Sequence, residues 1–293
     1  MANTEGSIFW WYGILTFARY LGAWSRWGWA WNVAPYRSGS QLLSASSVES
    51  LVIFLYGFTQ QFMERFGKRP GDPYTAKDIE HISIAVMFWG GGLVGLAIEN
   101  PTVRRWLSGE GASEETTEEK ILAATKEDRT PKTRSRWTTS NPLPAVVIGI
   151  TGIAMSAHHQ TYLFQIQIHS LWGYLLLGFA LCRSLTCFFE WVRPPPANPR
   201  LPAMPPTELI ASIFLGAGGF IFICSDEQIT FWAMRTHRGK STHCLSSSSL
   251  TSHVDDVMMF LNLAIAFTCV AYVWTTIVLV ISGSRRRSIT LHL

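Results

Sequence analysis

The sequence is short of charge. Only 15% of its 293 residues are Asp, Glu, Lys or Arg, whereas 48% are hydrophobic and thirteen are Trp. An ordinary soluble domain has about 25% charged residues. Long segments hold no charge at all, while eight of the 24 Lys and Arg residues fall within positions 104–136. This distribution argues against a soluble domain and indicates a polytopic membrane protein.

The common signatures of catalytic and cofactor sites are also absent. The five Cys residues form no CxxC pair, and the sequence has neither a CxxCH haem-attachment motif nor an HExxH zinc motif. The net charge of +4 is not gathered into a basic patch with interleaved aromatic residues, so we expect no nucleic-acid partner. The N-terminus has no basic region of the kind that begins a cleavable signal peptide. We therefore assign no catalytic residue and do not expect an enzyme.

Seven segments are apolar enough to cross a bilayer, which takes about 20 residues. They are residues 8–31, 48–66, 79–98, 145–164, 166–192, 209–233 and 257–282. Arg19 and Arg26 interrupt the first segment, and the fourth is short unless it includes His158, His159 and Gln160. The pattern predicts an all-α fold, a polytopic membrane helix bundle with about seven transmembrane helices that forms a single membrane domain over residues 1–293.

Four polar segments separate or follow these helices. We expect a mobile cytosolic loop at 100–143, a Pro-rich connector at 193–206, a Ser-rich loop at 236–254 and a basic tail at 283–293. Small residues inside the helices predict close helix packing, at Gly91 and Gly95 in a GxxxG pattern and at Gly216–Gly219.

The loop Lys and Arg residues predict the orientation. If the C-terminal Arg285–Arg287 is cytosolic, fifteen basic residues lie in cytosolic segments and seven lie outside; Arg19 and Arg183 lie within helices and are not counted. Because cytoplasmic loops carry an excess of Lys and Arg, we expect a cytosolic C-terminus and an N-terminus on the opposite side.

Polar side chains gather at the outer ends of these predicted helices. They are Glu64, Asp78, Glu80, His81, His158, His159, Gln160, Gln165, Gln167, His169, Asp226, Glu227, Gln228, His253, Asp255 and Asp256. The inner ends carry little beyond Glu49, Glu99, Glu190 and Glu208, which we expect at loop edges. Inserting an ionisable side chain at the centre of a membrane costs at least about 2.5–3.5 kcal/mol on insertion scales. We therefore expect the polar side chains at the outer helix ends to face the interior of the helix bundle and to pair there.

Four interpretations of this outer cluster remain open. A divalent metal (zinc, copper or iron) could be bound by His81, His158 or His159, and His169, with Glu64 or Glu227. Two of these four His residues on facing helices could instead ligate a b-type haem. The cluster could also relay protons or carry a transported ion, or its members could simply form hydrogen bonds between helices. His158 and His159 point about 100° apart on a helix, so at most one faces the site directly.

Several motifs give a family resemblance. The segments are "SIFWWYGILTFARYLGAWSRWGWAWNV", "ESLVIFLYGFTQQFMERFG", "TAKDIEHISIAVMFWGGGLVGL", "PLPAVVIGITGIAMSAHHQTYLFQIQIHSLWGYLLLGF", "MPPTELIAS", "SDEQITFWAM" and "DDVMMFLNLAIA". In this order they resemble the C-terminal domain of the fungal Ytp-like proteins, over nearly the whole chain except the loops. The resemblance implies a multi-spanning membrane protein and no particular activity.

The same resemblance implies a partner. Longer members of the family carry an N-terminal, His-bearing membrane half that is similar to a b-type cytochrome of the ferrireductase kind. We therefore expect such a cytochrome-like half to be missing from this chain, as in a partial gene model or a split-off domain. The segment "RGKSTHCLSSSSLTS" at 238–252 departs from the family pattern as an insertion or an unspliced intron would.

Overall fold

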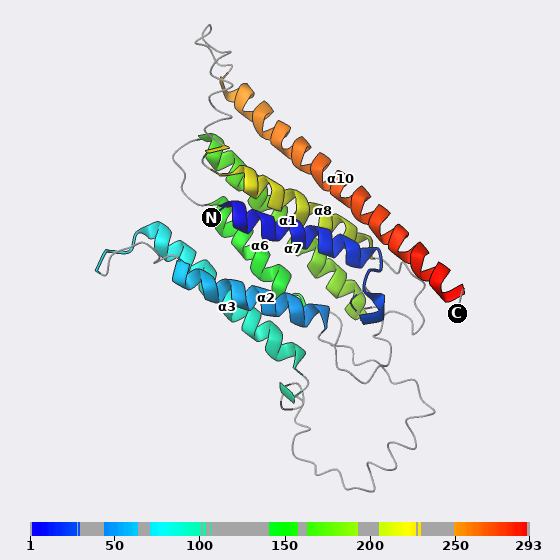
Figure 1. Ribbon diagram of the computed structural model, residues 1–293. Coiled ribbons are helices and arrows are strands. Elements are labelled where there is room, and N and C mark those ends of the chain that lie inside the picture. The colour runs from blue at the N-terminus through cyan, green and yellow to red at the C-terminus, as the bar shows by residue number, and fades with distance from the viewer. Residues whose placement is uncertain are drawn as a thin grey trace. The chain divides into compact units, whose positions relative to one another are not determined.

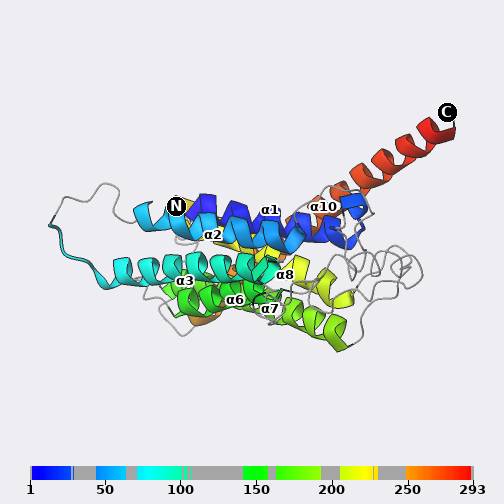
Figure 2. The same ribbon diagram turned by 90° about the horizontal axis from the view of Figure 1, so that it is seen from below.

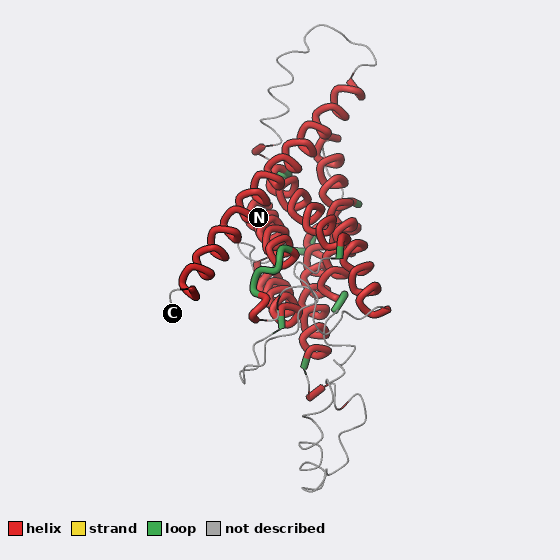
Figure 3. The backbone as a smooth tube through the Cα atoms, turned by 90° about the vertical axis from the view of Figure 1, so that its right-hand side faces the viewer, coloured by secondary structure: helices red, strands yellow, loops and turns green. Residues whose placement is uncertain are grey.

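The computed structural model describes residues 2–27, 29, 44–63, 71–100, 102, 103, 106, 141–157, 163–192, 205–226, 228, 229 and 249–291. Over these ranges the protein is all-helical, as predicted (Figures 1 and 3). The helices are α1 (Ala2–Tyr20), α2 (Ala45–Met63), α3 (Ala76–Glu99), α6 (Leu143–Ser156), α7 (Leu163–Val192), α8 (Pro206–Cys224) and α10 (Ser249–Leu291), with a 3-10 turn at Ser25–Trp27. Each of these seven helices corresponds to one predicted span, and α7 also takes in the last two residues of the span predicted at 145–164.

Four helices of the described ranges contain segments that are long and apolar enough to cross a membrane: Asp78–Glu99, Gln165–Val192, Pro206–Cys224 and Met258–Gly283. Helix α6 is apolar but shorter, because it ends at Ser156. Helix α10 is longer than predicted: it starts within the expected Ser-rich loop and continues into the expected basic tail. Most of the predicted loop at 100–143 and of the connector at 193–206 lies outside the described residues.

The chain divides into two compact units, which are described separately. Unit 1 comprises Met1–Gly39, Ala145–Thr186 and Pro196–Leu293, and unit 2 comprises Ser40–Pro144 and Cys187–Pro195. The single membrane domain that the sequence predicts remains a prediction.

In unit 1, α1 and α8 pack with their backbones in contact. A Cβ atom placed on Gly13 would lie 2.6 Å from the backbone nitrogen of Gly216, and one on Gly6 would lie 2.6 Å from the backbone nitrogen of Ile223. Because the earlier residue of α1 meets the later residue of α8, the two helices are antiparallel. The close packing predicted at Gly216–Gly219 is confirmed.

Tyr272, on α10, contacts both helices of this pair. Its hydroxyl donates to the backbone oxygen of Ser212 at 2.6 Å and lies 3.3 Å from that of Gly13. Its ring stacks on Phe17 of α1 with the ring centroids 4.0 Å apart. One side chain therefore contacts both α1 and α8.

In unit 2, α2 and α3 lie side by side (Figure 2). A Cβ atom on Gly95 would lie 2.5 Å from the Ser50 hydroxyl oxygen, and the backbone of Gly92 meets that of Phe54. Gly92 and Gly95 therefore lie in close contact with α2. The close packing predicted at Gly95 is confirmed, and the part of the prediction that concerns Gly91 stays a prediction.

Candidate functional site

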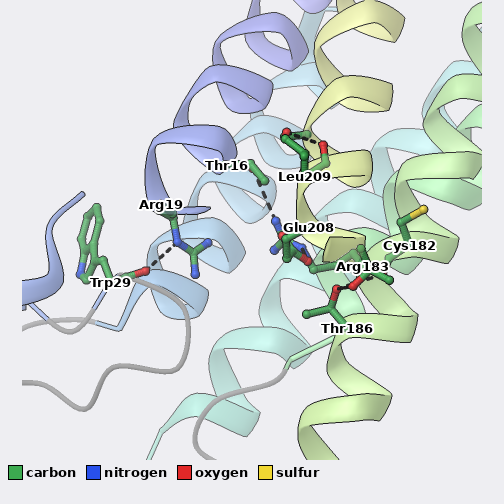
Figure 4. A network of polar contacts seen from close by, with 10 residues as sticks. Thr16, Arg19, Trp29, Cys182, Arg183, Thr186, Glu208 and Leu209 are labelled. Atoms are coloured by element: carbon green, nitrogen blue, oxygen red, sulfur yellow. Dashed lines mark hydrogen bonds and ion pairs between the residues drawn. The ribbon is translucent and has the colours of Figure 1, made fainter. Parts of the chain in front are cut away.

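An ion pair lies inside unit 1. The Nε atom of Arg183, on α7, is 2.7 Å from Oε1 of Glu208, on α8, and the two side chains are 3% and 0% exposed (Figure 4). Both residues belong to segments that are apolar enough to span a membrane. The pair thus places two opposite charges where water is excluded.

The periodicity of α7 explains the position of Arg183. One set of buried residues on this helix recurs every three or four positions, which is the spacing of one helix face. This set is Ile168, Trp172, Leu176, Phe179, Arg183, Thr186 and Glu190. Arg183 follows four apolar residues in this stripe, and its guanidinium carbon lies 5.5 Å from the centre of the Phe179 ring.

Glu208 is held by the start of α8. Pro205 is the N-cap residue and no side chain caps the helix, while Glu208 lies in its first turn. A helix N-terminus carries a partial positive charge, which favours a carboxylate at this position. Arg183 then supplies the full positive charge that a buried carboxylate needs.

Threonine hydroxyls surround the pair. Thr16 of α1 lies 3.5 Å from an Arg183 Nη atom, at the long limit of a hydrogen bond. Thr186 donates to the backbone oxygen of Cys182 at 3.1 Å, so the Thr207 hydroxyl, 2.5 Å away, donates to Thr186. We call Arg183, Glu208, Thr16, Thr186 and Thr207 the charge centre. It connects α1, α7 and α8.

The sequence alone does not reveal the charge centre. Glu208 lies in the first turn of α8, close to the loop edge at which it was expected, but its complete burial and its pairing with Arg183 were not predicted. Arg183 was predicted only to lie within a helix. The available signal was the place of Arg183 in the three- and four-residue spacing of apolar residues on α7.

The outer histidine cluster lies largely beyond the described residues. Four of its predicted ligands, Glu64, His158, His159 and Glu227, fall there. His81 is half-buried on α3 in unit 2, and His169 is half-buried on α7 in unit 1. Among the described residues, no three or more His, Cys, Asp or Glu side chains are grouped as metal ligands would be. The shared metal or haem site stays a prediction.

Two local features of this cluster are described. Nδ1 of His169 lies 2.9 Å from the backbone oxygen of Gln165, one turn earlier. Asp78 accepts a 2.8 Å hydrogen bond from the backbone nitrogen of Thr75 and so forms a capping box at the start of α3.

The chain is similar to known membrane proteins along most of its length. The family profile described as "Protein YTP1-like, C-terminal" matches residues 3–283. A Schizosaccharomyces pombe protein named "Uncharacterized membrane protein C3B8.06" is 32% identical over 284 residues, which cover 95% of this chain and 50% of the relative. A Saccharomyces cerevisiae protein named "Uncharacterized membrane protein YCR061W" is 36% identical over 240 residues, 76% of this chain and 35% of the relative.

This chain thus spans about half the length of the first relative and about a third of the second. The profile covers nearly all of the chain, and the described helices include four that are apolar and long enough to span a bilayer. The chain therefore belongs to the Ytp1-like family, as its sequence motifs predicted, and it is an integral membrane protein.

Proposed function

We propose that this chain is a transport-type membrane protein whose charge centre takes up and releases a proton. The observation that carries this proposal is the buried contact of 2.7 Å between Arg183 and Glu208. Ionisable residues within membrane helices are costly and commonly mark ion pathways or proton relays. A carboxylate between three helices is a suitable proton carrier for such a pathway.

Protonation of Glu208 would remove the negative charge that compensates Arg183. The neutral acid no longer balances the charge of Arg183, and an uncompensated buried charge is strongly destabilising. Proton uptake would therefore favour an arrangement in which Arg183 gains water or another anion. The three helices joined by the charge centre would respond together, which couples the proton to a change in conformation.

The proposal includes an orientation. The charge centre joins the C-terminal half of α7 to the first turn of α8. The excess of Lys and Arg in the neighbouring loops assigns this end, and the C-terminus, to the cytosolic side. Protons would then reach Glu208 from the cytosol.

Proteoliposomes that contain a pH-sensitive dye test this function. We expect the wild-type protein to move protons when a membrane potential is imposed, and Glu208→Gln to reduce the rate about tenfold or more, because an amide carries no exchangeable acid proton. Asp72→Asn, at an exposed position before α3, is the matched control and should leave the rate unchanged. Wild-type flux no greater than that of empty liposomes, or full flux in Glu208→Gln, would refute the proposal.

A second candidate function is the binding of a divalent metal or a b-type haem at the outer cluster. The orientation of His169 favours it: a ligating histidine usually gives its other ring nitrogen to a carbonyl or carboxylate, as Nδ1 of His169 does with Gln165. The ligands would be His81, His158 or His159, and His169, with Glu64 or Glu227. A cytochrome-like membrane half would be the partner in electron transfer.

Elemental analysis and an absorption spectrum of purified protein test this candidate. We expect about one metal ion or one haem per chain, with a loss of occupancy in His169→Ala. A protein without stoichiometric zinc, copper or iron, and without haem absorption when it is expressed with added haem precursor, would exclude the site.

A further inference from the structure

We propose that α10 is the interface through which two copies of this chain associate in the membrane. The interface lies on the exposed face of its apolar segment, Met258–Gly283. Six residues, separated alternately by four and three positions, form it: Asn262, Ala266, Cys269, Val273, Thr276 and Val280. We call these six residues the α10 stripe. It shares no residue with the charge centre or with the outer histidine cluster.

The opposite face of α10 packs on the rest of unit 1. Its buried residues recur every four positions and are Phe260, Ala264, Thr268 and Tyr272. A Cβ atom on Gly216 of α8 would lie 2.9 Å from Cγ2 of Thr268, so this face meets α8 closely. Residues two positions apart lie on nearly opposite sides of a helix, and Asn262 and Ala266 therefore point away from α8. Five residues of the α10 stripe are exposed, and Thr276 is half-buried.

The spacing and the size of these side chains are those of a contact between helices. Alternating steps of four and three residues follow the seam along which two helices pack side by side. No side chain of the α10 stripe is larger than valine. The exposed residues on either side of it are large and apolar: Met259, Leu263, Ile265, Phe267, Trp274 and Ile277. Small side chains allow two membrane helices to approach closely, whereas large apolar ones suit contact with lipid.

Asn262 is the independent sign that another helix covers this face. It is exposed one turn inside the apolar segment, and its carboxamide forms no hydrogen bond with another residue that the structure describes. Lipid tails offer no hydrogen-bonding group, so a polar side chain within a membrane helix is best satisfied by a neighbouring helix. The carboxamide has both N–H donors and an acceptor oxygen. Its partner must therefore offer an acceptor and a donor at the same depth.

A second copy of the chain meets this requirement. All copies insert into the membrane in the same orientation, so their α10 helices run parallel. A two-fold axis along the membrane normal then brings each residue of the α10 stripe next to its own counterpart. Asn262 donates to Asn262 of the second copy and accepts from it, and Cys269 lies beside Cys269 of the second copy. The α10 stripe contains no charged residue, so the two copies do not repel each other along it.

Oxidation of the full-length protein in its membranes with copper phenanthroline tests the interface, because Cys269 is an exposed free thiol. We expect a covalent dimer on non-reducing gels, and its loss in Cys269→Ser. Adding Val273→Cys to Cys269→Ser should restore the dimer, since position 273 belongs to the α10 stripe. Trp274→Cys in the same background is the matched control: this exposed position is on the flank, and we expect about tenfold less dimer.

The role of Asn262 has a separate test. Energy transfer between donor- and acceptor-labelled copies in detergent micelles measures the association without a covalent bond. We expect Asn262→Leu to weaken the association about three- to tenfold, the usual effect of one hydrogen bond between membrane helices. Leu263→Ala, at an exposed flanking position, is the control and should leave the association unchanged. Because both positions are exposed, neither substitution disturbs the packing of α10 on α8.

Each result bears on the proposal. Dimers that form through positions 269 and 273 but not through 274 support it, as does weaker association of Asn262→Leu. Equal cross-linking at 273 and 274 overturns it, because random collisions would then explain the dimers. A wild-type protein that forms no dimer, or one whose Cys269 cross-links only to a different protein, overturns it as well. Proton flux through the charge centre is measured independently, so the two proposals fail separately.

Discussion

Arg183 and Glu208 form a buried ion pair in which Nε and Oε1 are 2.7 Å apart, and they belong to two helices that the Pro-rich segment separates in sequence. Each of these buried charges is tolerated only in the presence of the other, because the attraction between them offsets the cost of removing both from water. Removal of one partner and removal of both should therefore have very different consequences.

The first prediction follows from this difference. Arg183→Met alone, or Glu208→Leu alone, should lower the free energy of unfolding by about 3–5 kcal/mol, because each leaves an uncompensated buried charge. The double variant should be much closer to wild type, since it buries two apolar side chains of similar size. Thermal unfolding in detergent, followed by size-exclusion chromatography, measures all three.

Glu80→Leu serves as the control, because Glu80 is exposed at the start of α3. If the double variant is as unstable as the sum of the two single variants, the charges do not compensate each other and the ion pair has no energetic coupling.

The second prediction concerns Tyr272. Tyr272→Phe keeps the ring that stacks on Phe17 but removes the hydroxyl that donates to the Ser212 backbone oxygen at 2.6 Å. The expected loss of stability is about 0.5–1.5 kcal/mol, the usual worth of one hydrogen bond. Tyr174→Phe, where the residue is 64% exposed, should change stability little. Equal effects of the two substitutions would show that the contact of Tyr272 with α8 is not specific.

The third prediction compares two glycines. Gly13→Ala would bring a methyl group within 2.6 Å of the backbone of Gly216, so α1 and α8 must move apart. We expect a loss of about 1–3 kcal/mol, as for other overpacked sites. Gly90→Ala meets nothing within 4 Å and should gain up to about 1 kcal/mol from its higher helix propensity. Thermal stability of both variants gives the comparison, and equal stability would contradict the packing of α1 on α8.

The helices could be predicted from the sequence because their signal is local. Each described helix coincides with a run of apolar residues, and that run needs no knowledge of its neighbours. Boundaries were less predictable: α10 starts at Ser249, in a segment whose serines favour a loop, because the following apolar residues extend one continuous helix.

The charge centre could not be predicted from composition because it depends on two distant segments. Arg183 has no acidic neighbour on its own helix face one turn away, and Glu208 lies beyond the Pro-rich segment. Considered alone, Arg183 indicates only a charge within an apolar segment, and Glu208 indicates only the edge of a loop. Their pairing follows only from the packing of α7 against α8, for example at Gly178, where an added Cβ atom would lie 2.9 Å from the Phe214 ring.

The last prediction concerns the orientation in the membrane. We expect the segment 100–143 and the C-terminus to be cytosolic, because eight of the 24 Lys and Arg residues lie at 104–136 and three more at 285–287. Protease added to sealed, right-side-out vesicles should spare this segment, whereas the same protease should cut it after detergent has opened the vesicles. A tag after Leu293 should be protected in the same way. Cleavage of the 100–143 segment in sealed vesicles would invert the topology, and Glu208 would then receive its protons from the opposite side.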